Sequence, residues 1–221
     1  MSEPGTAQNP FLYEGSQAKV ERFFLLCAFV AGKHAGMQQR KLDEFLASIH
    51  KAGDERPFIN LLRLWNVDRL VISSGPQATR ESETGRIGQA LRQAKVGQYT
   101  RLTWLLYQIA FKTSVGTNWL RYAERDDLIQ LPGFGLKSAS MFLLYTRHNM
   151  RLAALDTHVL QWLAKQPGAS HVPKSTPSGK LYLELEQQFC DHADRLGMKP
   201  ADLDWKIWSE NSVTMKFLTQ M

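Results

Sequence analysis

The sequence contains little cysteine and no long apolar run, and both shortages restrict what the protein can be. Its two cysteines, Cys27 and Cys190, are too few for a disulfide framework, a structural zinc site or a cysteine-ligated iron–sulfur cluster. The longest apolar run, Phe23 to Ala31, has nine residues, whereas a membrane-spanning helix needs roughly 20. The N-terminal stretch MSEPGTAQNP lacks the basic-then-apolar order of a secretion signal. We therefore expect a cytoplasmic protein that makes no membrane contact.

Acidic residues are scarce in one part of the chain. Residues 84–183 contain 13 Lys and Arg but four acids, so this segment carries +9 in a chain whose net charge is +6. Between residues 128 and 183 the only acid is Asp156. Such a basic segment suggests a polyanionic partner such as nucleic acid, but charge alone fits a solvated basic face, which is common on soluble proteins, at least as well. A lone carboxylate in so basic a stretch suggests a specific role for Asp156.

The sequence does contain enough apolar residues for a core, and their periodicity is helical. Hydrophobic residues make up 43% of the 221 residues, which suits one large domain or two small lobes. No convincing run of alternating apolar and polar residues indicates a strand. We predict an all-α fold with loops at 73–85 and 167–178, with one or two short helices at 117–130, and with helices at 19–31, 38–51, 57–64, 99–112, 136–147, 157–165, 176–196 and 200–218.

The segment DDLIQLPGFGLKSASMFLL predicts two helices joined by a tight turn. Pro132 ends the first helix, and Gly133 and Gly135 permit backbone conformations that other residues resist. The second helix starts immediately afterwards, at Leu136, so its first N–H groups point out of the turn. A helix N-terminus with exposed amides can bind a phosphate without using any side chain. For the turn taken alone, a plain αα-hairpin is the alternative.

The hairpin and its surroundings resemble the helix-hairpin-helix DNA glycosylase superfamily. LPGFGLKSA, followed 19 residues after its lysine by LDTHV, is similar to the hairpin and downstream aspartate of that superfamily. VGQYTRLTWLL, at 96–106, is similar to the segment whose loop enters the duplex, and residues 23–46 are similar to an early helix–loop–helix. The resemblance implies a single domain over residues 1–221, with its active site in the cleft between two helical lobes. The N-terminal and C-terminal helices would form one lobe, and the central helices with the 131–137 hairpin would form the other.

Lys137 and Asp156 are the candidate catalytic residues. An amine in the first turn of a helix, near basic neighbours, is favoured in its neutral form, which can attack C1′ of a deoxynucleotide and expel the base. The resulting Schiff base permits β-elimination, and a carboxylate near C1′ stabilises the positive charge that builds on the sugar. By resemblance, the two residues fall on the superfamily's catalytic lysine and aspartate. This implies a bifunctional DNA glycosylase/AP lyase with no metal or organic cofactor, whereas a surface lysine and a helix N-cap are the ordinary alternatives.

The end of the chain suggests which base is damaged. Many homologous glycosylases carry an iron–sulfur cluster after the aspartate, and this chain has only Cys190 there. PADLDWKIWSENSVTMKFLTQM resembles the C-terminal stretch of small prokaryotic 8-oxoguanine glycosylases, the type 2 and archaeal forms. The resemblance implies that Trp208 stacks on the base, that Lys216 reads it and that Met141 adds a stacking side chain, with Trp65 as a further candidate. Tryptophan and methionine in helices are more often core residues, and an oxidised pyrimidine is the alternative substrate.

The expected partner is double-stranded DNA that contains a damaged base, bound by a monomer in the nucleoid. Flipping a base out of the duplex leaves a gap that side chains must fill. By position, the expected DNA contacts come from three places in the chain: Gly133, Gly135 and Leu136 at the hairpin, Gln98 and Tyr99 in the loop before it, and Lys33 and His34 after the first helix. A structural monovalent cation at the hairpin is the one cofactor left open. The remaining alternative is a non-enzymatic module that uses the hairpin only to bind phosphates.

Overall fold

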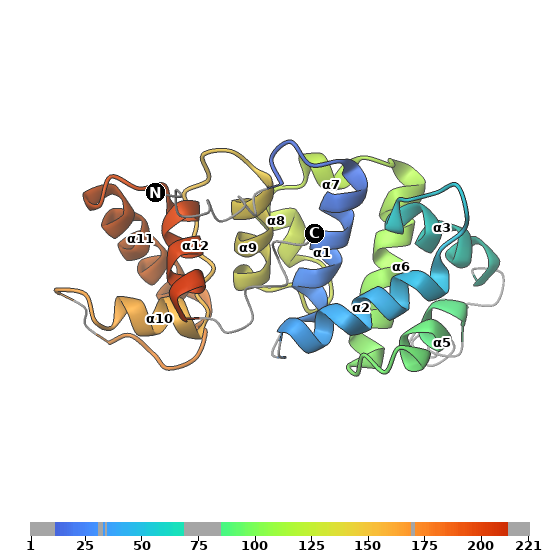
Figure 1. Cartoon of the computed structure of the whole chain (residues 1–221), viewed down its shortest axis with the longest axis horizontal. Helices are drawn as coiled ribbons and strands as arrows, with labels where there is room; N and C mark the ends of the chain where they lie inside the picture. Colours follow the sequence, from blue (N-terminus) through green and yellow to red (C-terminus); the bar gives the residue numbers. More distant parts are fainter. Residues whose placement is uncertain (1–11, 31–32, 34, 69–84, 169–170, 212–221) are drawn as a thin grey trace, which may run out of the picture. The chain divides into compact units, whose positions relative to one another are not determined.

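The computed structural model describes residues 12–30, 33, 35–68, 85–168 and 171–211, and no β-strand occurs among them. The helices in chain order are α1 (Gln17–Phe29), α2 (Ala35–Ile49), α3 (Pro57–Asp68), α5 (Arg86–Gln93), α6 (Tyr99–Val115), α7 (Trp119–Tyr122), α8 (Arg125–Ile129), α9 (Leu136–Thr146), α10 (Thr157–Leu163), α11 (Gly179–Arg195) and α12 (Pro200–Asn211), as Figure 1 shows. The all-α prediction is confirmed. None of these helices is long and apolar enough to cross a membrane.

Most predicted helices are present, with ends that side-chain hydrogen bonds have shifted. The segment 117–130, predicted to form one or two short helices, forms two, because Glu124 and Asp127 form a capping box that starts α8 separately. The predicted start at residue 176 is wrong, since the Thr176 hydroxyl donates to the Leu155 carbonyl and α11 begins at Gly179. Helix α5 was not predicted. The last part of the predicted helix 200–218 lies outside the described residues.

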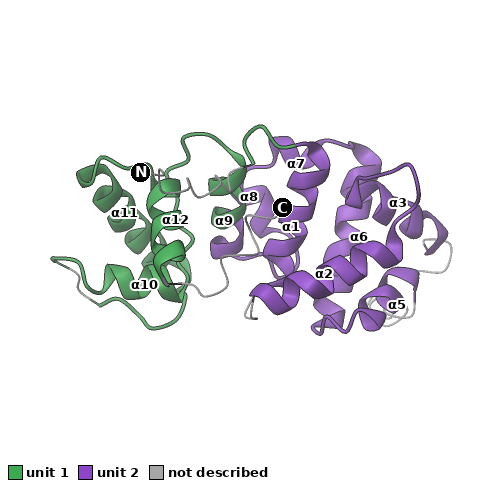
Figure 2. Cartoon of the chain, in the orientation of Figure 1, with its two compact units in different colours: residues 1–15, 140–221 green, residues 16–139 purple. Residues whose placement is uncertain are grey.

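The chain divides into two compact units, coloured separately in Figure 2: residues 16–139, and residues 1–15 with 140–221. The boundary falls inside α9, between Ala139 and Ser140. Helix α1 groups with the central helices, whereas the resemblance implied that it would group with the C-terminal ones. The reason is that α1 packs against α2 and α3. That the chain forms a single domain stays a prediction.

Helix α1 is the central element of the 16–139 unit. It is apolar on most of its faces, and it buries an unbroken run of residues from Phe23 to Phe29. Phe24 stacks on Phe134 with ring centroids 4.6 Å apart, and it meets Phe58 edge-on at 5.8 Å. Because Phe134 belongs to the hairpin between α8 and α9, this aromatic contact joins the hairpin to the core.

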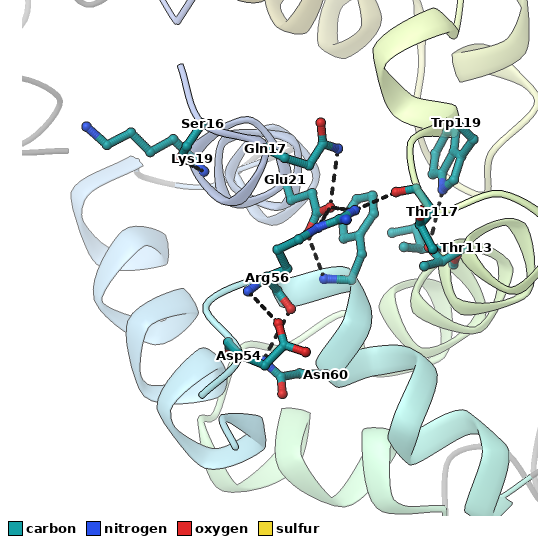
Figure 3. Close-up of polar contacts among 12 residues, drawn as sticks. Ser16, Gln17, Lys19, Glu21, Asp54, Arg56, Asn60, Thr113, Thr117 and Trp119 are labelled. Atoms are coloured by element: carbon teal, nitrogen blue, oxygen red, sulfur yellow. Dashed lines mark hydrogen bonds and ion pairs between the residues drawn. The ribbon is translucent and has the colours of Figure 1, made fainter. Parts of the chain in front are cut away.

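A buried carboxylate holds the start of α3. The side chain of Glu21 on α1 is fully buried and accepts hydrogen bonds from Nε and Nη2 of Arg56, at 3.0 and 2.6 Å (Figure 3). It also accepts a 2.9 Å bond from the backbone N–H of Phe58, in the first turn of α3. Burial raises the pKa of Glu21, and the bonds from Phe58 and Arg56 act in the opposite direction. Glu21 therefore caps α3 from another helix, at the end where a negative charge is favoured.

The second unit is built on the end of α9. The N–H of Leu12 donates to the Tyr145 carbonyl at 2.7 Å, which attaches the segment before α1 to this helix. The Tyr145 hydroxyl donates to Oδ2 of buried Asp204 on α12 at 2.9 Å, and Trp205 meets the Tyr145 ring edge-on at 6.4 Å. Tyr145 thus fixes the first half of α12.

We expect Glu21→Ala to lower the free energy of unfolding by about 3–5 kcal/mol, because it leaves the Phe58 N–H without its acceptor and the Arg56 guanidinium without its carboxylate partner. Urea denaturation followed by far-UV circular dichroism measures this change. The matched control is Asp43→Ala, which removes the more exposed ion pair with Arg22 and should cost about 1 kcal/mol or less. Equal losses in the two variants would contradict the capping role of Glu21.

Candidate functional site

The predicted hairpin joins α8 to α9 and is closed by a 3.0 Å hydrogen bond from the Phe134 N–H to the Leu131 carbonyl. Gly133 has a φ of +71°, in the left-handed region that favours glycine. Gly135 does not have a positive φ; it is exposed, and a Cβ added there would meet nothing within 4 Å. The two glycines therefore differ: Gly133 shapes the turn, and Gly135 leaves the space in front of it open.

The N-terminus of α9 presents the expected group of amides. The first hydrogen bond of the helix runs from the Ala139 N–H to the Gly135 carbonyl, at 3.0 Å. The N–H groups of Leu136, Lys137 and Ser138 therefore have no acceptor within the helix. Leu136 and Lys137 are half-buried, while Ser138 is buried.

Arg101 of α6, which was not predicted, fixes the hairpin and the loop before α6 together. Its Nε donates to Oε1 of Gln98 at 2.6 Å, and its Nη1 and Nη2 donate to the carbonyls of Gly133 and Ala28 at 3.4 and 2.9 Å. Burial lowers the pKa of Arg101. The one signal in the sequence is its spacing of three residues from Gln98, which is one helical turn.

The loop before α6 has an unusual backbone. Lys95, Gly97 and Gln98 all have positive φ values, of 51°, 74° and 51°. Tyr99 is half-buried, with the Arg92 guanidinium 5.1 Å from its ring centroid. A Cβ added at Gly97 would lie 3.9 Å from Nζ of the exposed Lys33. The structure thus places Lys33 beside this loop, and the DNA contacts of both stay predictions. His34 lies outside the described residues.

The amine of Lys137 lies near a buried thiol. Burial raises the pKa of Cys27 on α1 to about 12, and the positive charge of Lys137 acts in the opposite direction. Cys27 is therefore a neutral thiol at physiological pH, and it supplies no negative charge to the lysine.

Asp156 is the N-cap of α10, which was one of its two predicted roles. Its Oδ1 accepts hydrogen bonds from the backbone N–H groups of His158 and Val159, both at 2.9 Å. Its Oδ2 accepts a 2.6 Å bond from the indole Nε1–H of Trp208 on α12. Both carboxylate oxygens are therefore oriented by the protein.

The segment that leads into Asp156 is fixed by one face of α11. The Tyr182 hydroxyl donates to the Ala153 carbonyl at 2.5 Å, and Oε1 of Glu186 accepts from the Ala153 N–H at 3.0 Å. The Cys190 thiol, whose pKa burial raises to about 11, lies 3.9 Å from the Leu152 carbonyl. These three α11 residues are spaced four apart, so they lie along one face of the helix.

Sequence reasoning missed the role of Glu186. It is buried, with 6% of its surface exposed, and it also accepts a 3.3 Å bond from the hydroxyl of Ser140 on α9. Glu186 therefore links the helix that begins at Leu136 to the segment that ends at Asp156. The signal was present: an acid interrupts a helical stripe of otherwise uncharged buried residues, Tyr182, Leu185, Phe189, Cys190 and Ala193.

Three of the four residues predicted to touch the base fall within the described residues, each on a different helix. Met141 is half-buried on α9, one turn after Lys137. Trp65 is half-buried on α3, where it meets Phe111 of α6 edge-on at 6.3 Å. Trp208 contacts Asp156, and Lys216 lies outside the described residues. The base-contacting roles of all four stay predictions.

The candidate catalytic residues lie in different units. Lys137 belongs to the 16–139 unit and Asp156 to the other. No group of three or more His, Cys, Asp or Glu suited to a metal ion occurs among the described residues.

Comparison with known proteins gives curated relatives described as 8-oxoguanine DNA glycosylase/AP lyases. Over 88 residues the chain is 41% identical to an 8-oxoguanine DNA glycosylase/AP lyase of Thermoplasma volcanium. The aligned stretch covers 38% of this chain and 39% of that protein. A protein of the same description from Fusobacterium nucleatum is 32% identical over 88 residues, covering 39% of this chain and 40% of the relative. The matched stretch thus spans about two fifths of the length of these curated relatives.

Two solved structures share the fold. The 8-oxoguanine DNA glycosylase of Thermotoga maritima is similar with a TM-score of 0.60 and 21% identity, over 91% of this chain and 84% of that one. The Methanocaldococcus jannaschii 8-oxoguanine glycosylase/lyase, solved with a 15mer DNA containing 8-oxoguanine, is similar with a TM-score of 0.62 and 19% identity. This match covers 93% of this chain and 86% of that one. The sequence profile of the 8-oxoguanine DNA glycosylase family matches residues 84–198, which include the hairpin, Lys137 and Asp156. Because this match extends over more than half of the chain, the protein belongs to the helix-hairpin-helix family of 8-oxoguanine DNA glycosylases.

Proposed function

We propose that this protein is a bifunctional DNA glycosylase/AP lyase that removes 8-oxoguanine from duplex DNA and then nicks the strand at the resulting site. The observation that carries the proposal is the family match over residues 84–198, together with the two candidate catalytic residues inside it. Lys137 lies in the first turn of α9, and Asp156 caps α10.

In this mechanism Lys137 is the nucleophile. Its neutral amine attacks C1′, the glycosidic bond breaks, and the bonding electrons leave with the base, which then takes up a proton. Loss of the amine proton and opening of the sugar ring give a Schiff base between Nζ and C1′. The Schiff base acidifies C2′, whose deprotonation expels the 3′ phosphate and cuts the strand.

Asp156 stabilises the positive charge that develops on the sugar as the base departs. Its carboxylate is suited to this task because its hydrogen bonds to His158, Val159 and Trp208 fix its orientation before the substrate binds. All the groups that this chemistry requires are side chains of the protein, so we propose that the reaction uses no metal or organic cofactor. A monovalent cation at the hairpin stays a prediction.

The hairpin provides the proposed DNA contact. The amides of Leu136, Lys137 and Ser138 point out of the α9 N-terminus, where a phosphate is favoured. The exposed, open position at Gly135 leaves room for the backbone of a strand to approach. We further propose that the protein acts on damaged duplex DNA as a monomer in the nucleoid.

Lys137→Gln should abolish covalent trapping of the protein on 8-oxoguanine duplex in the presence of borohydride, because the amide cannot form a Schiff base. Affinity for the duplex should stay within about twofold, since no backbone amide is changed. The matched control is Lys165→Gln, an exposed lysine after α10, which should trap at the wild-type yield. Normal trapping by Lys137→Gln would identify another amine as the nucleophile.

The substrate is tested with a panel of duplexes that each carry one lesion, under single-turnover conditions. We expect excision of 8-oxoguanine to be fastest, with thymine glycol slower by at least about tenfold, because discrimination by a few buried hydrogen bonds reaches this size. Faster release of thymine glycol would reassign the substrate to oxidised pyrimidines and leave the chemistry in place. DNA binding without any excision or trapping would indicate the non-enzymatic module.

The two hairpin glycines should separate folding from DNA binding. Gly133→Ala places a Cβ 2.3 Å from Cδ of Arg101 at a φ of +71°, and we expect it to lower the free energy of unfolding by about 1–3 kcal/mol. Gly135→Ala should leave stability within about 0.5 kcal/mol and weaken duplex binding, because its Cβ enters the open space. Thermal denaturation measures the change in stability, and fluorescence anisotropy measures the change in DNA binding. Normal DNA binding by Gly135→Ala would contradict a phosphate contact beside Gly135.

A further inference from the structure

The indole N–H of Trp208 holds the candidate catalytic carboxylate. Nε1 lies 2.6 Å from Oδ2 of Asp156, which is a short distance even for a hydrogen bond to a charged acceptor. Trp208 also meets the ring of His158 edge-on, with centroids 6.0 Å apart. His158 also donates its backbone N–H to Oδ1 of the same carboxylate. The indole therefore contacts both Asp156 and the first turn of the helix that Asp156 caps.

These contacts use most of the acceptor capacity of Asp156. A carboxylate has about four lone-pair sites, two on each oxygen. On Oδ1, two bonds come from backbone N–H groups, and on Oδ2 one comes from Trp208. The described contacts therefore leave one site on Oδ2, and Trp208 determines its direction.

The helix that carries Trp208 is itself fixed. One turn before Trp208, Trp205 packs edge-on to Tyr145, and the hydroxyl of Tyr145 donates to Asp204. Helix α12 also packs against α10. The indole N–H is consequently supported by a rigid element, as a group that has to orient another requires.

We propose that Trp208 is a positioning residue for Asp156: its indole N–H fixes Oδ2 so that the remaining lone pair is directed at the sugar when the base departs. This proposal rests on the proposed function and adds to the stacking role expected from the resemblance. Stacking uses the face of the indole ring, whereas positioning uses the N–H on its edge.

The two roles are separated by Trp208→Phe, which keeps an aromatic face and removes the edge donor. At saturating enzyme, we expect this variant to release 8-oxoguanine about 10-fold to 100-fold more slowly, the effect of one hydrogen bond to a charged group. Its dissociation constant for the lesion duplex should stay within about twofold of the wild type. Ser209→Ala is the control on the same helix: it removes an exposed hydroxyl that donates to the Lys206 carbonyl, and it should keep the wild-type rate.

A double-mutant cycle with Asp156→Asn tests whether the effect passes through the carboxylate. In the Asp156→Asn background, Trp208→Phe should change the residual rate by less than about twofold, because the negative charge that the indole N–H directed at the sugar is already gone. The effects of the two substitutions multiply if Trp208 acts only by stacking or by supporting the fold, and that outcome would overturn the proposal. A wild-type rate for Trp208→Phe, or a loss confined to duplex affinity, would overturn it equally.

The wild-type protein distinguishes failure of this proposal from failure of the proposed function. If the wild type excises 8-oxoguanine and Trp208→Phe does so equally fast, only the positioning role fails. If the wild type excises no lesion, the proposed function fails and the positioning role fails with it.

Discussion

The carboxylate of Asp156 is an acceptor that joins two helices of the unit to which residues 140–211 belong. An N-cap aspartate accepts the free amides of the first helical turn through a side-chain oxygen. Here α10 supplies two amide donors and α12 supplies the indole. Helix α11 holds the preceding segment through Tyr182 and Glu186. Three helices, α10, α11 and α12, therefore contribute hydrogen bonds that hold this side chain or the segment that precedes it.

Buried acids are used in the same way in both units. Glu21 accepts from a backbone N–H at the start of α3, and Glu186 accepts from the backbone N–H of Ala153. In each case a carboxylate on one helix supplies the acceptor that a neighbouring segment lacks. Burying a charge costs free energy unless the charge is hydrogen-bonded in this way. These acids therefore serve more to fix which segment lies against which helix than to raise the free energy of unfolding.

Local patterns predicted the helices and the hairpin because both depend on nearby residues. The Pro132–Gly135 turn and the capping role of Asp156 are encoded within a few positions, and both were anticipated. Arg101 and Glu186 were missed because their partners lie 32 and 33 residues away, at Gly133 and Ala153. Periodicity carries no information about which distant carbonyl or amide a buried charge will meet. The donor from Trp208 to Asp156, across 52 residues, was likewise out of reach of sequence reasoning.

The order of the units along the chain has a consequence for synthesis. Residues 12–15 group with a unit whose other residues begin at Ser140, while the complete 16–139 unit lies between them. A ribosome therefore releases all of the inserted unit before Leu12 can meet the Tyr145 carbonyl that receives its N–H. The first half of α9 can fold with the earlier unit, and the second half then completes the later one. During synthesis the chain therefore passes through a stage in which only the first part of α9 has folded and the Leu12 N–H has not yet met the Tyr145 carbonyl.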